Sequence, residues 1–205
     1  KELNYRPNYM DRALSTKQSR TIAGIVPSIA NPFFPQIFKS VEDVAFRNSF
    51  SVVMCNTEGN PERVMRYQKM LLEQRVAGLL ITMTWDLTRP EVIGPFIEAD
   101  IPVVGLAGSR SADQIDIVMP DDLWGARQAT DYLLQMGHRR IAYLGVTESH
   151  TTKLRLEGFR EAHRRAQVPL VEELVMLGHD FKEDEGYTLT KQLLSEGRDF
   201  TAIFA

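Results

Sequence analysis

The chain has 205 residues, of which 43% are hydrophobic and 25% are charged. This composition supports one large folded domain or two small ones and excludes a disordered chain. Cys55 is the only cysteine, which excludes an intrachain disulfide framework and a multi-cysteine zinc site. The sequence lacks a continuous apolar run of 18 residues and an N-terminal apolar signal segment, so we expect a cytoplasmic protein without membrane contact.

The net charge of −3 is unevenly distributed. Residues 1–20 contain five lysines or arginines and two acidic residues, so this segment carries +3 and the remaining chain carries −6. A short basic segment on an acidic body is typical of a chain whose end contacts phosphates. A solvated terminus is the alternative interpretation.

Eight short apolar segments, recurring from Thr21 onward, predict β-strands. They are Ile22–Pro27, Phe50–Asn56, Gly78–Met83, Pro102–Leu106, Ile115–Met119, Ile141–Gly145, Glu173–Leu177 and Ala202–Phe204. Several are continuously apolar, which is typical of strands buried on both faces of a parallel sheet.

Segments with helical periodicity lie between these strands. Apolar residues recur from Ile37 to Ala45, and Asn60-Pro61 supplies an N-cap and a first-turn proline for the next helix. Further helices are predicted at Arg89–Ala99, Leu123–Met136, Thr152–Gln167 and Asp184–Ser195. Gly137 and Gly197 follow two of them and suit the left-handed position after a helix. The alternation of strands and helices predicts a doubly wound α/β fold.

The predicted elements form two lobes. We place the boundary after Arg140, which gives a first lobe at residues 21–140 and a second at 141–205. The strand at Ala202–Phe204 is followed by no covering helix, so we expect the second lobe to be incomplete and the sequence to be a fragment.

Sequence motifs for catalysis are absent. The chain contains neither of the glycine-rich turns that bind dinucleotides or nucleoside triphosphates, nor the Gly-x-Ser-x-Gly nucleophile elbow. Its four histidines are at least twelve residues apart and none has an acidic neighbour at the spacing of a helical metal site. An enzyme is therefore unsupported, and no cofactor or metal is expected.

The N-terminal segment carries a family resemblance. Tyr5, Pro7, Asn8, Arg12 and Leu14 match a pattern, Tyr-x-Pro-Asn-x-x-Ala-Arg-x-Leu, that resembles the hinge of the lactose-repressor/galactose-repressor (LacI/GalR) family. Asp11 stands where alanine is usual.

Four further segments extend this resemblance over most of the chain. They are Ile22–Pro27 with Asn31–Phe34, Arg75–Ile81, Gly137–Gly145 and Arg155–Phe159, in the family's order and spacing. Departures include Ala107, where aspartate is common, and Asp122, where asparagine is common. The resemblance implies a periplasmic-binding-protein-like (type I) core with doubly wound parallel sheets in two lobes. It also implies a helix-turn-helix domain that is missing here except for its last residues, so residues 1–20 would be the end of the DNA-binding region and the hinge helix.

The resemblance implies a transcriptional regulator, most simply a repressor. Two hinge helices of a homodimer would enter the minor groove of operator DNA, with Leu14 wedged between base pairs and Arg12 contacting phosphate. Asn8 can cap the short hinge helix, which is too short to persist alone. A small effector, most simply a sugar, would change the angle between the lobes and so control the hinge.

The effector site is predicted at the carboxyl ends of the strands, where open α/β sheets bind ligands. The predicted effector-binding residues are Phe33, Phe34, Trp85, Asp121, Trp124, Arg155 and Phe181. By the resemblance, Phe33 and Phe34 take the family's loop positions, Arg155 that of the effector-clamping arginine and Phe181 that of the stacking aromatic residue. Core packing is the alternative interpretation for each aromatic residue.

Two other functions remain open at this point. A stand-alone sugar- or solute-binding protein shares the expected fold, although it would need a secretory signal and would have no use for the hinge-like segment. An enzyme on the same scaffold is a third possibility. Operator binding by the complete protein distinguishes the first interpretation from the other two.

Overall fold

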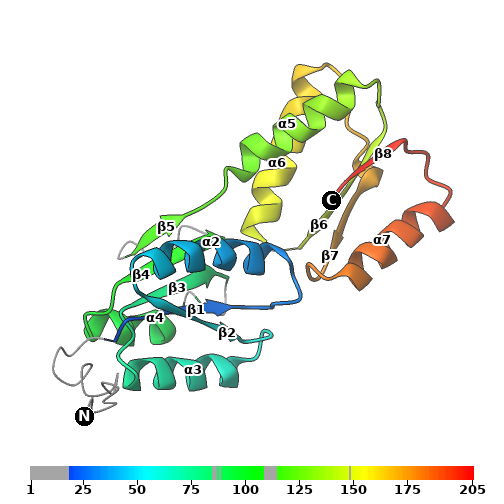
Figure 1. Ribbon diagram of the computed structural model, residues 1–205. Helices are drawn as coiled ribbons and strands as arrows, with labels where there is room; N and C mark the ends of the chain where they lie inside the picture. Colours follow the sequence, from blue (N-terminus) through cyan, green and yellow to red (C-terminus); the bar gives the residue numbers. More distant parts are fainter. Residues whose placement is uncertain (1–18, 85–86, 88, 109–114, 148) are drawn as a thin grey trace, which may run out of the picture. The chain divides into compact units, whose positions relative to one another are not determined.

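The computed structural model describes residues 19–84, 87, 89–108, 115–147 and 149–205. These residues form two compact α/β units that divide between Met119 and Pro120. Each unit has a parallel sheet of its own with helices on both faces (Figure 1). The predicted fold class is confirmed.

The first unit contains a five-stranded parallel sheet of strand order β2-β1-β3-β4-β5. The strands are β1 (Thr21–Val26), β2 (Ser51–Asn56), β3 (Gly78–Met83), β4 (Val103–Gly108) and β5 (Asp116–Val118). Helix α2 (Phe33–Arg47) covers one face, and α3 (Pro61–Glu73) and α4 (Pro90–Glu98) cover the other (Figure 1). Gly24 in β1 leaves room for α2, because a Cβ atom there would lie 2.0 Å from the Phe38 ring and the ring would have to move.

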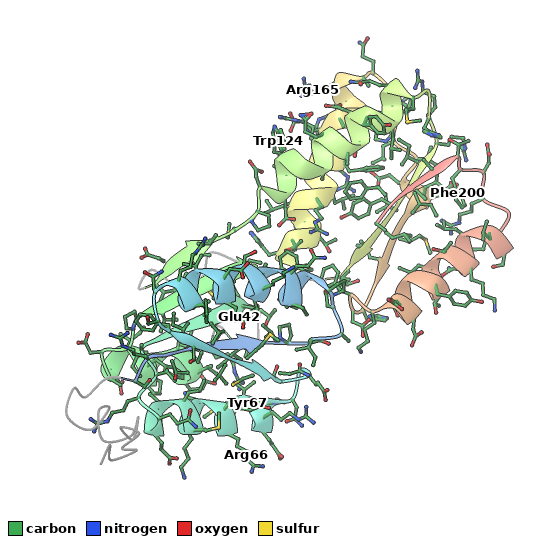
Figure 2. The ribbon with its side chains drawn as sticks, viewed as in Figure 1. Glu42, Arg66, Tyr67, Trp124, Arg165 and Phe200 are labelled. Atoms are coloured by element: carbon green, nitrogen blue, oxygen red, sulfur yellow. The ribbon has the colours of Figure 1, made fainter. Side chains whose placement is uncertain are left out.

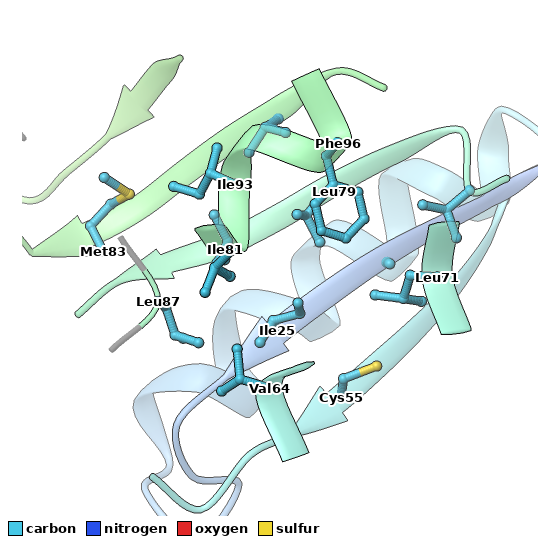
Figure 3. Packing of buried hydrophobic residues seen from close by; sticks show 14 residues of the cluster. Ile25, Cys55, Val64, Leu71, Leu79, Ile81, Met83, Leu87, Ile93 and Phe96 are labelled. Carbon is cyan, nitrogen blue, oxygen red and sulfur yellow. The ribbon is translucent and has the colours of Figure 1, made fainter. Parts of the chain in front are cut away.

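The main core of the first unit lies under α3 and α4 (Figure 3). Ile25, Leu71, Ile81 and Phe96 come from two strands and two helices and are completely buried. Cys55 packs among them at 2% exposure, as expected for a strand thiol, and burial raises its pKa to about 11. The predicted N-cap of α3 is confirmed, because the Asn60 side chain accepts hydrogen bonds from the amides of Glu62 and Arg63.

The second unit contains a three-stranded parallel sheet of order β7-β6-β8. Its elements are α5 (Asp122–Gln135), β6 (Ile141–Val146), α6 (His150–Arg165), a 3₁₀ turn at Glu172–Leu174, β7 (Val175–Gly178), α7 (Glu183–Ser195) and β8 (Ala202–Phe204). Helices α5 and α6 pack on one face of the sheet around Tyr143 and Phe159. Helix α7 packs on the other face through Leu189 and Leu193.

All eight predicted strands are present, with ends that differ by at most two residues. Gly137 and Gly197 have positive φ angles of 94° and 63°, as predicted for residues that end helices. The division between the units falls before α5, whereas the sequence predicted it after Arg140. Helix α5 belongs to the second unit because its buried face packs against α6, where Gly158 meets the Leu123 backbone.

Candidate functional site

The carboxyl-end edge of the second sheet is where its ligand site is expected. Strands β6 and β7 end side by side, with Val146 paired to Gly178. Helices α6 and α7 begin shortly after these strand ends, and α5 begins on the same edge because it runs back toward the start of β6. Three helix N-termini therefore meet at this edge.

Arg155 lies at this edge on α6 and forms an ion pair with Asp122 in the first turn of α5. Its Nε donates a hydrogen bond of 2.8 Å to Asp122 Oδ1. The Asp122 side chain is 9% exposed and that of Arg155 is 37% exposed. The carboxylate thus engages the Nε edge of the guanidinium, and the fork of terminal nitrogens is the part that a ligand can engage bidentately.

Close packing between α5 and α6 holds this pair in place. A Cβ atom on Gly158 would lie 2.2 Å from the Leu123 carbonyl oxygen, so only glycine lets the two backbones approach this closely. Gly158 is three residues after Arg155, and Leu123 follows Asp122 directly. The glycine contact therefore sets the separation between the helix segments that carry the ion pair.

Hydrogen bonds tie the first turn of α6 to β6. Ser149 caps α6 by accepting from the Thr152 amide, and Thr152 Oγ1 accepts from the Val146 amide at 3.0 Å. The Tyr143 hydroxyl donates to the Thr152 carbonyl oxygen at 3.1 Å. Burial raises the pKa of Tyr143 to about 12, with smaller opposing effects of Arg155 and Asp122, so this hydroxyl stays protonated and keeps its donor role.

The remaining predicted residues of this unit have different environments. Asp121 is the N-cap of α5, and its Oδ1 accepts from the Trp124 amide at 2.9 Å, so its carboxylate serves the helix. Trp124 is 52% exposed at the surface of α5 (Figure 2). Because Trp124 is two residues after Asp122, their side chains point about 200° apart around the helix, and the structure does not bring Trp124 to Arg155. Phe181 is 55% exposed in the segment between β7 and α7.

The first unit contains Phe33 and Phe34 at the start of α2. Their rings meet edge to face, with centroids 5.2 Å apart. Phe34 packs against the buried cluster of Val26, Phe38 and Leu106, whereas Phe33 is 40% exposed. Phe33 is therefore the ring that a ligand can reach, and Phe34 supports it from the core. Trp85 and the hinge residues Tyr5, Pro7, Asn8, Arg12 and Leu14 lie outside the described residues.

No sequence pattern indicates a role for Glu185. This residue of α7 folds back over Gly178, and its Oε1 accepts from the His179 amide at 2.9 Å. A carboxylate therefore lies against the carboxyl end of β7. A glycine at a strand end followed by an acidic first helical turn is too common a pattern to have indicated this contact.

No group of three or more metal-ligating side chains lies together in the part of the chain that the structure describes. Among the described helices, none combines the length and the apolar character needed to cross a membrane.

Parallel sheets with helices on both faces, in two consecutive units, define an α/β core of the periplasmic-binding-protein type. Residues 19–205 match the family model described as "Periplasmic binding proteins and sugar binding domain of LacI family". The chain belongs to this family.

Individual relatives cover the chain from end to end. It is 33% identical over 207 residues to the ribose operon repressor of Escherichia coli (strain K12), a match that covers all of this chain and 62% of that protein. It is 30% identical over 205 residues to the HTH-type transcriptional repressor PurR of Histophilus somni (strain 2336), covering all of this chain and 61% of that protein. The chain thus spans about three fifths of the length of these relatives.

A solved structure shows the same likeness. The LacI family transcriptional regulator from Enterococcus faecium, with bound ribose, superposes with a TM-score of 0.76 at 28% identity. The match covers 90% of this chain and 66% of that one.

Proposed function

We propose that this chain is the hinge and effector-binding part of a sugar-responsive transcriptional repressor of the LacI family. The observation that carries the proposal is the ion pair of Arg155 with Asp122 at the strand-end edge of the second unit. It occurs in a chain whose whole length matches 62% of a ribose operon repressor. The complete protein is a DNA-binding regulator in the cytoplasm and not an enzyme.

The effector-binding part of the proposal rests on the second unit. A sugar offers pairs of adjacent hydroxyl oxygens that a guanidinium fork can bind, and its apolar ring face stacks on an exposed aromatic ring. Arg155 supplies the fork, and Phe181, exposed after β7, supplies a ring. The regulator from Enterococcus faecium with bound ribose supports a sugar as the ligand class.

The DNA arm of the proposal rests on the sequence of residues 1–20. Arg12 contacts phosphate and Leu14 wedges into the minor groove, with Tyr5, Pro7 and Asn8 forming the rest of the hinge pattern. The helix-turn-helix domain supplies the base contacts. Effector binding controls operator affinity through the hinge.

The protein acts as a homodimer in this proposal. Strand β2 lies at the edge of the first sheet and presents Val53 and Met54, each nearly 40% exposed. Phe46, at the end of α2, is 80% exposed. A strand at the edge of the described sheet, with exposed apolar side chains, favours association with a second copy, and a two-fold axis lets the same residues serve both copies.

Thermal-shift measurements on the full-length protein test the effector-binding part of the proposal. We expect at least one simple sugar, with D-ribose as the first probe, to raise the melting temperature. Arg155→Ala should abolish this shift, whereas Arg164→Ala, on the same helix, should leave it unchanged. A shift that survives Arg155→Ala would contradict the assignment of this edge as the effector site.

Binding of the full-length protein to operator fragments at low salt tests the DNA arm. We expect affinity that falls with salt concentration and changes when the sugar is added. Leu14→Ala should weaken specific binding without altering the sugar-induced thermal shift. A complete protein with no DNA affinity, with or without sugars, would instead favour a stand-alone binding protein.

A further inference from the structure

We propose that the effector is an uncharged sugar and that Asp122 sets this preference by excluding phosphorylated sugars and other anions. The inference rests on the proposed function and goes further, because it names the charge of the ligand and the residue that selects it. The charges and helix ends at the strand-end edge of the second unit carry the argument.

The first step concerns the charge of the Arg155 site. Arg155 is the cation at the contact of α5 with α6, and its Nε already binds Asp122 at 2.8 Å. Since the Asp122 side chain is only 9% exposed, water screens its charge weakly. The pair is neutral overall, so the guanidinium retains its hydrogen-bond donors but loses most of its attraction for an anion. The uncharged hydroxyl groups of a sugar need only the hydrogen-bond donors of the guanidinium and not its charge.

The second step concerns the surrounding charges. The N-caps and first turns of the three helices and the segment after β7, taken together with Arg155, contain six carboxylates and three cationic side chains, a net charge of −3 with histidine neutral. The carboxylates are Asp121, Asp122, Asp180, Glu183, Asp184 and Glu185, and the cations are Lys153, Arg155 and Lys182. Lys182 forms an ion pair with Asp180, which lowers the pKa of that carboxyl group.

The third step concerns the helix N-termini, which bind phosphate groups in many α/β proteins. Asp121 caps α5 and Ser149 caps α6, so a side-chain oxygen already accepts from one first-turn amide of each helix, that of Trp124 and that of Thr152. The first turn of α7 carries Glu183, Asp184 and Glu185. Each of the three helix ends therefore already holds an acceptor or a carboxylate. A phosphate group would thus approach an edge of the second unit that offers hydrogen-bond donors without net positive charge.

Matched pairs of a sugar and its phosphate ester test the inference on the full-length protein. The pairs are D-ribose with ribose 5-phosphate, D-glucose with glucose 6-phosphate and D-fructose with fructose 1-phosphate, measured by calorimetry. We expect one neutral sugar to bind at least about tenfold more tightly than its ester, a difference of about 1.4 kcal/mol. An ester that binds as tightly as its parent sugar, or more tightly, would overturn the inference and leave the sugar-sensing function standing. Failure of every sugar and every ester would overturn both.

The variant Asp122→Asn tests whether Asp122 causes the preference for the neutral sugar over its phosphate ester. Asparagine keeps the size of the side chain and an oxygen acceptor for Arg155 Nε, but removes the negative charge. We expect the variant to bind the ester about tenfold more tightly, with affinity for the neutral sugar changed by less than about threefold. Asp131→Asn, farther along α5, should leave both affinities unchanged. Equal effects of the two variants would refute a specific role of Asp122.

Discussion

His163 is the one histidine of the chain that the structure buries, at 2% exposure. Its ring packs 4.8 Å from that of Phe159, and Nδ1 lies 3.2 Å from the Val168 carbonyl oxygen, which fixes Nδ1 as the protonated nitrogen. Nε2 is buried without a hydrogen-bond partner among the described residues. Burial lowers the pKa of His163 below its ordinary value of 6.5, because the charged ring would lose its hydration.

This burial makes the stability of the protein depend on pH. Since the folded pKa is lowered, the unfolded chain binds more protons just below pH 6.5, and His163 reduces stability as the pH falls. We expect urea denaturation midpoints of the full-length protein to fall between pH 7 and pH 5, with a contribution from His163 of at most about 1.4 kcal/mol per pH unit. His163→Leu should flatten this dependence. The exposed His179, changed to Gln, should not alter it, and a pH profile unaffected by His163→Leu would contradict the argument.

At the scale of single residues, the sequence could predict roles that depend on local spacing. Asn60 lies before a proline and an apolar period, and the structure confirms it as the α3 cap. Asp121 was assigned to ligand binding although it too occupies the position before a helix. The ion pair between Asp122 and Arg155 joins residues 33 positions apart and depends on how α5 and α6 pack, which no local pattern specifies.

At the scale of elements, the contact between α5 and α6 depends on one glycine. Gly158→Ala would place a methyl group against the Leu123 backbone, which cannot retreat as a flexible side chain could. We expect a loss of stability of about 1–3 kcal/mol from this overpacking, measured by urea denaturation, together with weaker sugar binding. Gly125→Ala is the matched control on α5, since nothing lies within 4 Å of its added methyl group. It should be neutral or stabilise by up to about 1 kcal/mol.

The elements themselves could be predicted well because their signals are local. Continuously apolar strands and amphipathic helices depend on residues within one segment, and every predicted strand is present. The sequence instead predicts α5 in the first lobe, because the lobe to which a helix belongs depends on contacts with distant segments. Helix α5 precedes the crossover signature at Gly137–Gly145, and only its packing with α6, through residues such as Gly158, places it in the second unit.

At the scale of the whole molecule, each unit has hydrophobic cores of its own. The core around Ile81 and Phe96 belongs to the first unit, and the core around Tyr143 and Phe159 belongs to the second. Cys55, buried in the first core, can report on that unit. Because Cys55 is 2% exposed and burial raises its pKa to about 11, a labelling reagent reaches a reactive thiolate only when the first unit opens.

We therefore expect the units to be destabilised separately by core changes. In the full-length protein, Gly158→Ala should speed hydrogen exchange in peptides of β6 and α6. The urea dependence of Cys55 labelling, followed by peptide mass mapping, should remain that of the unchanged protein. Leu71→Ala, at a fully buried position of the first core, should have the opposite pattern, with a cost of about 2–5 kcal/mol confined to the first unit. If each change shifted both readouts equally, the two cores would unfold as one cooperative body, and the division at Met119 would describe geometry without independent stability.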